Sequence, residues 1–410
     1  MSERAGFVAL FVATLINLAL LTYAASNLSL SSQEAEIYFE ASSFLHYVSH
    51  AFTGRFGESE LALRAPFLLM HFINVFLLYK VAKPILPRRE DRLLSAIIFM
   101  FLPGVLASAI LVNAAVFIVA FALLSIRFVQ EKAFWRLGIL LATGLILSRA
   151  FLALYLALIF YGLYKKERVF TALGTVCALA WFWTYDYNTG GKPSGHLVDT
   201  MGIFGATFSP LIFIYFIYAV YRVWIKESKD FLWFVSTTAF CMALVLSARQ
   251  KLPLELLLPY CVIFVPHMAR LFLTSYRIRL PRFRKGYRIL GVVLLLTLAA
   301  NAFSSIFSDF LYAKFENPRR HFAFHYTGAN ELAAALKKAG ITNVRCDQEL
   351  ALRLRFYGIN DGWRYYVVDD EKECGEDRMR LTVPIKRAGA TIRNYFVCQR
   401  RENNSNLKAR

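Results

Sequence analysis

Residues 6–25 read GFVALFVATLINLALLTYAA, twenty consecutive positions without a charged side chain. An α-helix rises about 1.5 Å per residue, so a run of this length spans the roughly 30 Å hydrocarbon core of a bilayer. A basic residue precedes it, as in a signal peptide, but the run exceeds the roughly 7–15 apolar residues typical of signal peptides. We therefore interpret residues 6–25 as a first transmembrane span that the protein retains.

Similar apolar stretches recur along most of the chain. Of its 410 residues 57% are hydrophobic and 18% are charged, whereas about a quarter of the residues of a soluble domain are charged. We predict an α-helical polytopic membrane protein with about eleven transmembrane helices. The predicted spans are residues 6–25, 62–84, 93–111, 114–130, 136–148, 150–164, 169–186, 204–223, 231–248, 253–274 and 289–310.

The basic residues predict the orientation. If the N-terminus lies in the cytoplasm, every strongly basic short loop falls on the cytoplasmic side, as the positive-inside rule requires. These loops cover residues 83–92, 127–136, 165–168, 222–229 and 277–288. We attribute the net charge of +19 to this asymmetry and to anionic lipid headgroups, and we expect no nucleic acid partner. The sequence therefore predicts a multi-pass protein of the inner (plasma) membrane.

The composition changes after about residue 312. A helical pattern over residues 329–340, ANELAAALKKAG, is followed by four strand-like runs, NVRC (343–346), RYYVVD (364–369), LTVPIKR (381–387) and TIRNYFVC (391–398). We predict a transmembrane domain over 1–312, with an interfacial helix in the first outer loop (26–61). A small extracytoplasmic α/β domain over 313–400 and a disordered tail over 401–410 follow it.

Three cysteines lie in this predicted outer domain, where disulfides are permitted. We predict that either Cys346 or Cys374 pairs with Cys398, because NVRC and YFVC are both strand-like and could lie side by side. The spacing does not choose between the two partners.

The first outer loop carries an acidic cluster. Residues 31–40 read SSQEAEIYFE, which places Glu34, Glu36 and Glu40 at the outer membrane surface. A solvated acidic face at the start of a helix is one reading, because the helix dipole favours a negative charge there. A set of catalytic carboxylates is the other.

Cations predicted on the same side support the catalytic reading. Arg149 stands within LILSRAFLAL, far from any cytoplasmic basic loop, and an isolated charge at membrane depth commonly marks function. Arginine and lysine suit phosphate groups, and a carboxylate suits a general base. Other charged residues predicted on the outer side are Arg249, Lys251 and Glu255 between two late spans, and Arg64, His46 and His50 complete the set.

Several stretches together resemble the GT-C glycosyltransferases, specifically the bacterial relatives of protein O-mannosyltransferases and lipid A aminoarabinose transferases. The stretches are FGESELALRAPFLL (56–69), PGVLASAILVNAAVFIVAFALL (103–124), GLILSRAFLALYLALIFYGLYKK (144–166), ARQKLPLELLLPYCVIFVPHMA (248–269) and ELALRLRFYGIN (349–360). The resemblance implies a GT-C-like fold and transfer of a sugar from a polyprenyl-phosphate donor to a lipid, glycan or protein acceptor at the outer face.

Candidate site residues follow from these two arguments. Glu34 is the carboxylate that matches the family's acidic loop, and Arg149 stands where relatives carry a lysine. The full prediction is Glu34 and Glu36 as catalytic residues, Arg149, Lys251, Arg249 and Arg64 for the donor phosphate, and Gln33, His46 and His50 for positioning the acceptor or the loop. No cofactor is implied with certainty, and a divalent cation is left open.

The sequence also departs from the family pattern. Gln33-Glu34 stands where relatives carry Asp-Glu, Asn113-Ala114 where they carry an aspartate, and LHYVSHAF where they carry Pro-Pro. The general base is then Glu34 or Glu36, or catalysis is lost and the protein is a lipid-linked-sugar binding or scaffold protein. A transporter or flippase is a further alternative, although no repeated broken helices of the kind typical of transporters are evident.

Overall fold

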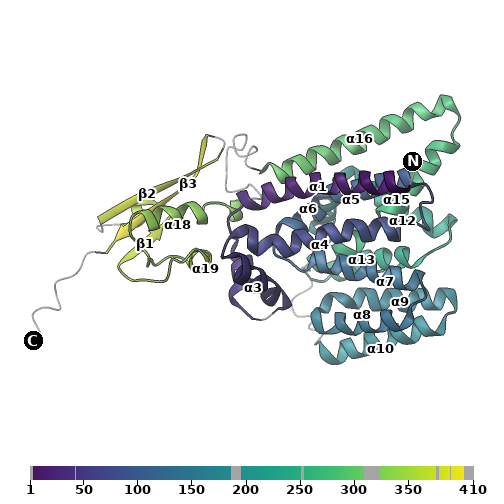
Figure 1. Cartoon of the computed structure of the whole chain (residues 1–410), viewed down its shortest axis with the longest axis horizontal. Coiled ribbons are helices and arrows are strands. Elements are labelled where there is room, and N and C mark those ends of the chain that lie inside the picture. The colour runs from purple at the N-terminus through teal and green to yellow at the C-terminus, as the bar shows by residue number, and fades with distance from the viewer. Residues whose placement is uncertain are drawn as a thin grey trace, which may run out of the picture. The chain divides into compact units, whose positions relative to one another are not determined.

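A computed structural model describes residues 3–41, 43–185, 195–250, 254–308, 324–374, 378–387 and 389–400. The chain is mainly helical, and a small sheet lies near its C-terminal end (Figure 1). Its contacts divide it into two compact units, one of residues 1–22 and 66–306 and one of residues 23–65 and 307–410. Two helices, α1 (Glu3–Asn27) and α4 (Glu60–Val81), contribute residues to both units.

The first unit is helical throughout its described residues. After α4 it contains α5 (Arg89–Phe101), α6 (Pro103–Ile110), α7 (Ala115–Gln130), α8 (Phe134–Leu147), η1 (Arg149–Phe151), α9 (Leu152–Lys165), α10 (Arg168–Thr184), α11 (Leu197–Phe208), α12 (Pro210–Lys226), α13 (Phe231–Ser247), η2 (Leu254–Leu256), α14 (Leu258–Val262), α15 (Val265–Ile278) and α16 (Pro281–Ile306).

Four helical segments in the described part of the chain are long and apolar enough to cross a membrane, namely Arg4–Asn27, Glu60–Val81, Leu258–Ile278 and Pro281–Ile306. Counting each of two bent helix pairs as one span raises the number to six. Helices α7, α8, α10 and α13 are apolar but shorter. The membrane-protein character is thus confirmed, and the total of eleven spans stays a prediction.

Proline breaks two of the predicted spans. Within the predicted span 93–111, α5 and α6 meet at Pro103 with a bend of 61°. Likewise α11 and α12 meet at Pro210 with a bend of 104°, inside the predicted span 204–223. Proline has no N–H to donate and clashes with the carbonyl four residues earlier, so a helix ends before each of these prolines. Both stretches stay predicted as spans, each with a bend. The second break is supported by Asn301, whose Nδ2 donates to Ser209 Oγ at 2.7 Å.

Two glycines set the close packing of α9 against α10. A Cβ atom at Gly162 would lie 2.6 Å from the backbone nitrogen of Thr171, and one at Gly174 would lie 3.0 Å from the carbonyl oxygen of Tyr155. Small residues allow apolar helices to approach closely, where dispersion contacts hold them together. This helix pair forms one wall of the groove described below.

The second unit joins residues 23–65, which include the predicted first outer loop, to the tail. Its helices are α2 (Ser32–Phe39), α3 (Phe44–Phe56), η4 (Phe324–Tyr326), α18 (Ala329–Lys338), α19 (Gln348–Phe356) and η5 (Glu371–Cys374), and its strands are β1 (Tyr365–Val368), β2 (Arg378–Arg387) and β3 (Ala390–Gln399). The sheet is antiparallel with the order β1-β3-β2. Leu332 and Leu336 of α18 and Leu354 of α19 pack with Val383 and Val397 in its core.

The strand predictions for the tail are confirmed for three of the four runs. RYYVVD, LTVPIKR and TIRNYFVC contain β1, most of β2 and β3. NVRC forms only isolated bridges, one of which pairs Arg345 with Tyr366 of β1. Because β1 lies between Arg345 and β3, the predicted pairing of NVRC with YFVC was wrong.

A disulfide joins Cys374 to Cys398, with their Cα atoms 5.9 Å apart. This confirms the prediction that one of two cysteines pairs with Cys398 and identifies the partner. Cys346 is a free thiol, and burial raises its pKa to about 12.

The domain boundary predicted near residue 312 stays a prediction. The compact units assign residues 23–65, which include the predicted interfacial loop 26–61, to the same unit as the tail. The predicted disordered segment 401–410 lies outside the described residues.

Candidate functional site: an acidic loop, an apolar groove and a smaller cavity

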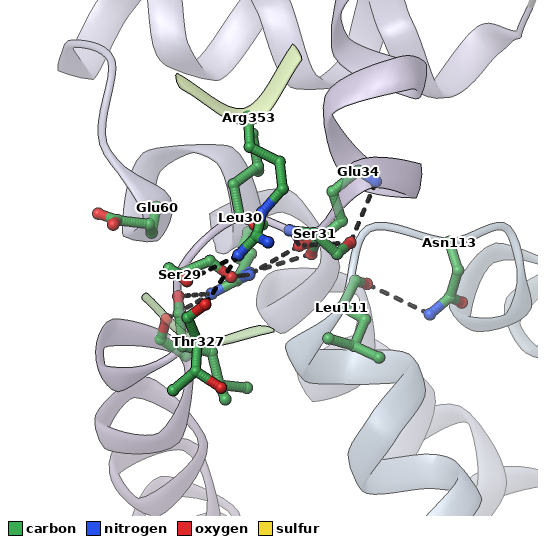
Figure 2. Close-up of polar contacts among 12 residues, drawn as sticks. Ser29, Leu30, Ser31, Glu34, Glu60, Leu111, Asn113, Thr327 and Arg353 are labelled. Carbon is green, nitrogen blue, oxygen red and sulfur yellow. Dashed lines mark hydrogen bonds and ion pairs between the residues drawn. The ribbon is translucent and has the colours of Figure 1, made fainter. Parts of the chain in front are cut away.

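Glu34 of the acidic loop is buried, with 2% of its surface exposed. Its position follows from the local sequence, because Ser31 and Glu34 form a capping box at the start of α2. The Ser31 backbone N–H donates to Glu34 Oε2 at 3.1 Å, and the Glu34 N–H donates to Ser31 Oγ at 3.2 Å. Figure 2 shows Glu34 facing Ser31 in this arrangement.

Arg64 of α4 forms a bidentate ion pair with the same carboxylate. Its Nε donates to Glu34 Oε1 at 3.1 Å and its Nη2 donates to Oε2 at 2.8 Å. Arg64 is fully buried, and its remaining donors go to the carbonyl oxygens of Ala25, Leu28 and Ser29. The predicted acidic base and one of the predicted phosphate-binding cations are therefore partners in a buried, bidentate ion pair.

A second buried arginine lies in the same unit. Arg353 of α19 is 6% exposed and donates to the carbonyl oxygens of Leu30, at 2.6 Å, and Thr327, at 3.1 Å (Figure 2). Burial lowers the pKa of this guanidinium. Nearby the Tyr357 hydroxyl donates to Glu60 Oε1 at 2.9 Å and accepts from the Leu30 N–H at 3.0 Å.

This second arginine was not among the predicted site residues. Arg353 and Tyr357 both belong to ELALRLRFYGIN, one of the stretches that carry the family resemblance. Their place in this stretch was the feature of the sequence that could have identified them as site residues. Their contacts with Leu30 show that the tail fixes the backbone directly before Ser31, in the same loop as Glu34.

The other predicted residues of the loop are more exposed. Gln33, Glu36 and Glu40 point to solvent. On α3 the rings of His46 and His50 lie 4.3 Å apart, and the His50 ring also stacks on Tyr38 at 4.1 Å. His50 Nε2 is 2.8 Å from the Tyr38 carbonyl oxygen, so this histidine joins α3 to α2.

Arg149 and Arg249 belong to the first unit. Both side chains are exposed, and neither has an ion pair within the described part of the chain. The backbone of η1 is fixed instead, since Trp181 Nε1 donates to the Arg149 carbonyl at 3.0 Å and the Tyr260 hydroxyl donates to the Ala150 carbonyl at 3.1 Å. Lys251, the remaining predicted cation, lies outside the described residues.

An apolar groove of about 580 Å³ begins three residues after Arg149. It lies between α9, α10 and α13, and it contains Leu152 at the start of α9 and Leu246 at the end of α13. Phe160 and Trp233 line it further along the same helices. The groove thus extends along the helices from the end where Arg149 and Arg249 stand.

A smaller, mostly apolar cavity of about 220 Å³ with four polar side chains lies between α6, the start of α7, α11 and the η2–α14 segment. Ser108, Asn113, Thr207 and Glu255 line it. Asn113 is held locally, because its Nδ2 donates to the Leu111 carbonyl at 3.3 Å (Figure 2) and its Oδ1 accepts from the Ala115 N–H at 2.9 Å. Glu255 is exposed and has no ion pair among the described residues.

The sequence analysis placed Glu255 among the outer charges beside Arg249 and Lys251, but did not predict it as a site residue. Glu255 lines the same cavity as Asn113. Asn113 is the residue that stands where the family pattern given above has an aspartate. Only the packing of α6, α11 and η2 reveals this relation. Among the described residues, no group of three or more histidine, cysteine, aspartate or glutamate side chains is placed to hold a metal ion.

The chain shares its arrangement of bent and short apolar helices and a small α/β unit with ArnT, a solved structure with the GT-C fold. The chain is similar over 97% of its length to the crystal structure of ArnT from Cupriavidus metallidurans in the apo state, with a TM-score of 0.56 and 12% identity. It is similar over the same share to ArnT of that organism bound to undecaprenyl phosphate, with a TM-score of 0.55 and 11% identity. Each alignment covers 98% of the ArnT chain.

No family model matches the sequence, and no curated protein matches it. The likeness to ArnT, a lipid A aminoarabinose transferase, therefore rests on the fold. At this level it confirms the resemblance that the sequence predicted.

Proposed function

We propose that the protein is a membrane glycosyltransferase that moves a sugar from a polyprenyl-phosphate donor to an acceptor at the outer membrane face. The single observation that carries this proposal is the fold, shared over nearly the whole chain with a transferase solved in complex with undecaprenyl phosphate. The predicted eleven spans, the inner-membrane location and the cytoplasmic N-terminus belong to the same proposal.

The apolar groove between α9, α10 and α13 is the proposed site of the polyprenyl chain. Its side chains, such as Leu152, Phe160 and Trp233, gain contacts with an isoprenoid chain and hold no charge that would need water. Arg149 at its end is exposed and lacks an ion pair among the described residues, so its guanidinium is available for two charge-assisted hydrogen bonds to a phosphate. Arg249 and Lys251 are further proposed phosphate ligands.

The two kinds of carboxylate have different proposed roles. Glu34 accepts hydrogen bonds on both oxygens, so taking a proton from an acceptor would require it to give up Arg64. We assign it, with Arg64, the role of fixing the outer loop. The general base is then Glu255 or Glu36, which lack ion pairs within the described residues, and Glu255 is preferred because it lines a cavity.

The remaining loop residues complete the proposed site. Gln33, His46 and His50 are proposed to position the loop or the acceptor, because they lie on α2 and α3 beside the carboxylates. The acceptor is a lipid, a glycan or a protein, and all three offer a hydroxyl or amine whose proton a carboxylate can take as the bond to the sugar forms.

A lipid-linked-sugar binding protein is the second candidate. Two observations favour it. Glu34, which matches the family's acidic loop, is held in a buried ion pair, and the neutral Asn113 stands where the family pattern has an aspartate. Such a protein would hold the donor in the groove and release no product.

One experiment separates the two candidates. Transfer to any acceptor releases free polyprenyl phosphate, so its release from a polyprenyl-phosphate sugar can be measured without knowing the acceptor. The full chain in nanodiscs is incubated with labelled donor and with membrane extract as acceptor source, and donor binding is measured in parallel. Binding with release supports the enzyme, binding without release supports the binding protein, and absence of binding contradicts both.

A further inference from the structure

The end of α15 and the first turns of α16, residues 277–289, carry a cluster of basic side chains. Arg279, Arg282, Lys285 and Arg288 are exposed, and Arg284 is half-buried. None of these five has an ion pair with a carboxylate among the described residues; the adjacent Arg277 does, binding Asp91 through Nη1 at 2.6 Å. Five cations therefore stand together without neutralising partners in the described part of the chain.

Three contacts of Arg279 and Arg284 fix the arrangement of this segment. Arg284 turns back onto the chain, where its Nε donates to the Arg279 carbonyl at 2.8 Å and its Nη2 to the Arg277 carbonyl at 3.1 Å. The Arg279 guanidinium lies over the Tyr287 ring, 4.0 Å from its centre. The cations are thus held on an ordered turn and are not spread along a free loop.

Apolar side chains surround the cations. Ile278, Leu280, Phe283 and Ile289 are each more than half exposed in the isolated chain. Alternating exposed apolar and basic side chains are typical of a segment at a membrane interface, where the apolar groups enter the acyl region and the cations meet headgroups.

A small apolar cavity lies beside this segment. It has a volume of about 90 Å³ between α5, α12, α15 and α16, and Ile98, Ile212, Phe272, Gly291 and Leu295 are among its lining residues. No charged side chain lines it. The cavity lies next to the basic turn, because the ring of Phe272 in its wall contacts Tyr287 at 5.6 Å between ring centres, and Arg279 lies over Tyr287.

We propose that this turn and cavity form a binding site for an anionic glycerophospholipid of the adjoining leaflet. The lipid phosphate would lie against Arg279 and Arg288, and part of one acyl chain would enter the cavity past Phe272. Charge selects an anionic headgroup over a zwitterionic one, and the apolar cavity selects a lipid over a free anion. The site lies on helices other than those that line the groove of α9, α10 and α13, and it does not depend on the proposed transferase activity.

Native mass spectrometry of the detergent-solubilised full chain tests the site. Phosphatidylglycerol, phosphatidylcholine and undecaprenyl phosphate are titrated separately onto the protein. We expect phosphatidylglycerol to bind about tenfold more tightly than phosphatidylcholine, because both lipids offer a phosphate but the choline ammonium of phosphatidylcholine brings a positive charge close to the arginines. Equal binding of the two phospholipids, or binding of undecaprenyl phosphate alone, would overturn the proposal.

Two variants locate the binding. Arg279→Gln should weaken phosphatidylglycerol about tenfold, whereas Arg168→Gln, an exposed arginine at the start of α10, should leave it unchanged. Ala269→Leu fills the cavity from α15 and should weaken both phospholipids alike. The melting temperature of each variant is recorded without lipid, and binding is compared only for variants that melt like the wild type. If Arg279→Gln and Ala269→Leu both fold and both bind as the wild type does, no lipid occupies this site.

Discussion

The Arg64 guanidinium binds both oxygens of the Glu34 carboxylate, with Nε 3.1 Å from Oε1 and Nη2 2.8 Å from Oε2. Both residues are buried, and the pair connects the start of α2 to α4. An acidic residue that the sequence marks as a candidate base is thereby part of the framework of its loop.

Removing either partner should destabilise the protein. Glu34→Gln leaves Arg64 buried without its counter-charge, which costs about 3–5 kcal/mol of unfolding free energy. Arg64→Met should lower the unfolding free energy by at least as much, because it also removes the hydrogen bonds that Arg64 donates to the carbonyl oxygens of Ala25, Leu28 and Ser29. Thermal unfolding in detergent measures both. Glu36→Gln, on the exposed side of the same helix, is the control and should change stability by less than about 0.5 kcal/mol. Wild-type stability of Glu34→Gln would show that the ion pair is not structural.

Arg149 should control donor affinity. Arg149→Ala removes charge-assisted hydrogen bonds of about 1.5–3 kcal/mol each, so the affinity for a polyprenyl phosphate should fall by about tenfold to a hundredfold. Arg149→Lys should be milder, since either cation can meet a phosphate. Binding is measured with the full chain in nanodiscs. Arg168→Ala, on α10 of the same helix pair, should bind normally; a loss equal to that of Arg149→Ala would mean that the effect is general to surface charge.

Glu255 should control turnover. Loss of a positioned base lowers the rate by about 10²–10⁴, so Glu255→Gln should bind donor normally but release little polyprenyl phosphate. Adding Asn113→Asp returns a carboxylate to the same cavity and should restore part of the rate. If Glu255→Gln turns over like the wild type while Glu36→Gln does not, the base lies in the acidic loop.

The three tail cysteines should differ in reactivity. Non-reducing mass mapping should find Cys374 linked to Cys398 and Cys346 free. Because burial raises the pKa of Cys346 to about 12, little thiolate is present at pH 8, and alkylation should be far slower than for an ordinary thiol with a pKa of about 8.5. The rate should rise with pH up to about 12. Rapid alkylation at pH 8 would contradict the buried environment.

Loss of the disulfide should weaken the tail. Its cysteines are 24 residues apart, and closing a loop of this size stabilises a fold by about 3 kcal/mol. Cys374→Ser with Cys398→Ser should therefore lower the melting temperature in an otherwise matched, unreduced sample, while Cys346→Ser with an intact disulfide serves as control.

The orientation can be tested by labelling. With a cytoplasmic N-terminus, a cysteine replacing Arg282 should react with a membrane-impermeant reagent only after the cells are opened. A cysteine replacing the exposed Trp363 in the tail should react in intact cells. The opposite pattern would reverse the proposed topology.

Particular residues show what the sequence by itself determined. The uncharged run 6–25 fixes a membrane-spanning helix because no other backbone arrangement satisfies its hydrogen bonds in lipid. The period-two runs at β1, β2 and β3 specify strands. The helix ends at Pro103 and Pro210 were not predicted, although their cause is equally local. Local sequence preferences explain each of these features. The GT-C fold was also predicted from the sequence, through the five stretches that resemble that family.

The tertiary structure alone decided the roles of the charged residues. Glu34 and Arg64 are thirty positions apart, and Arg353 reaches the same loop from the far end of the chain, so no local pattern reveals their contacts. Asn113 and Glu255 share a cavity only because α6, α11 and η2 pack around it. A carboxylate in solvent and a carboxylate in a buried ion pair have the same letter in the sequence. Burial and the nearest opposite charge distinguish them, and both depend on how distant helices pack.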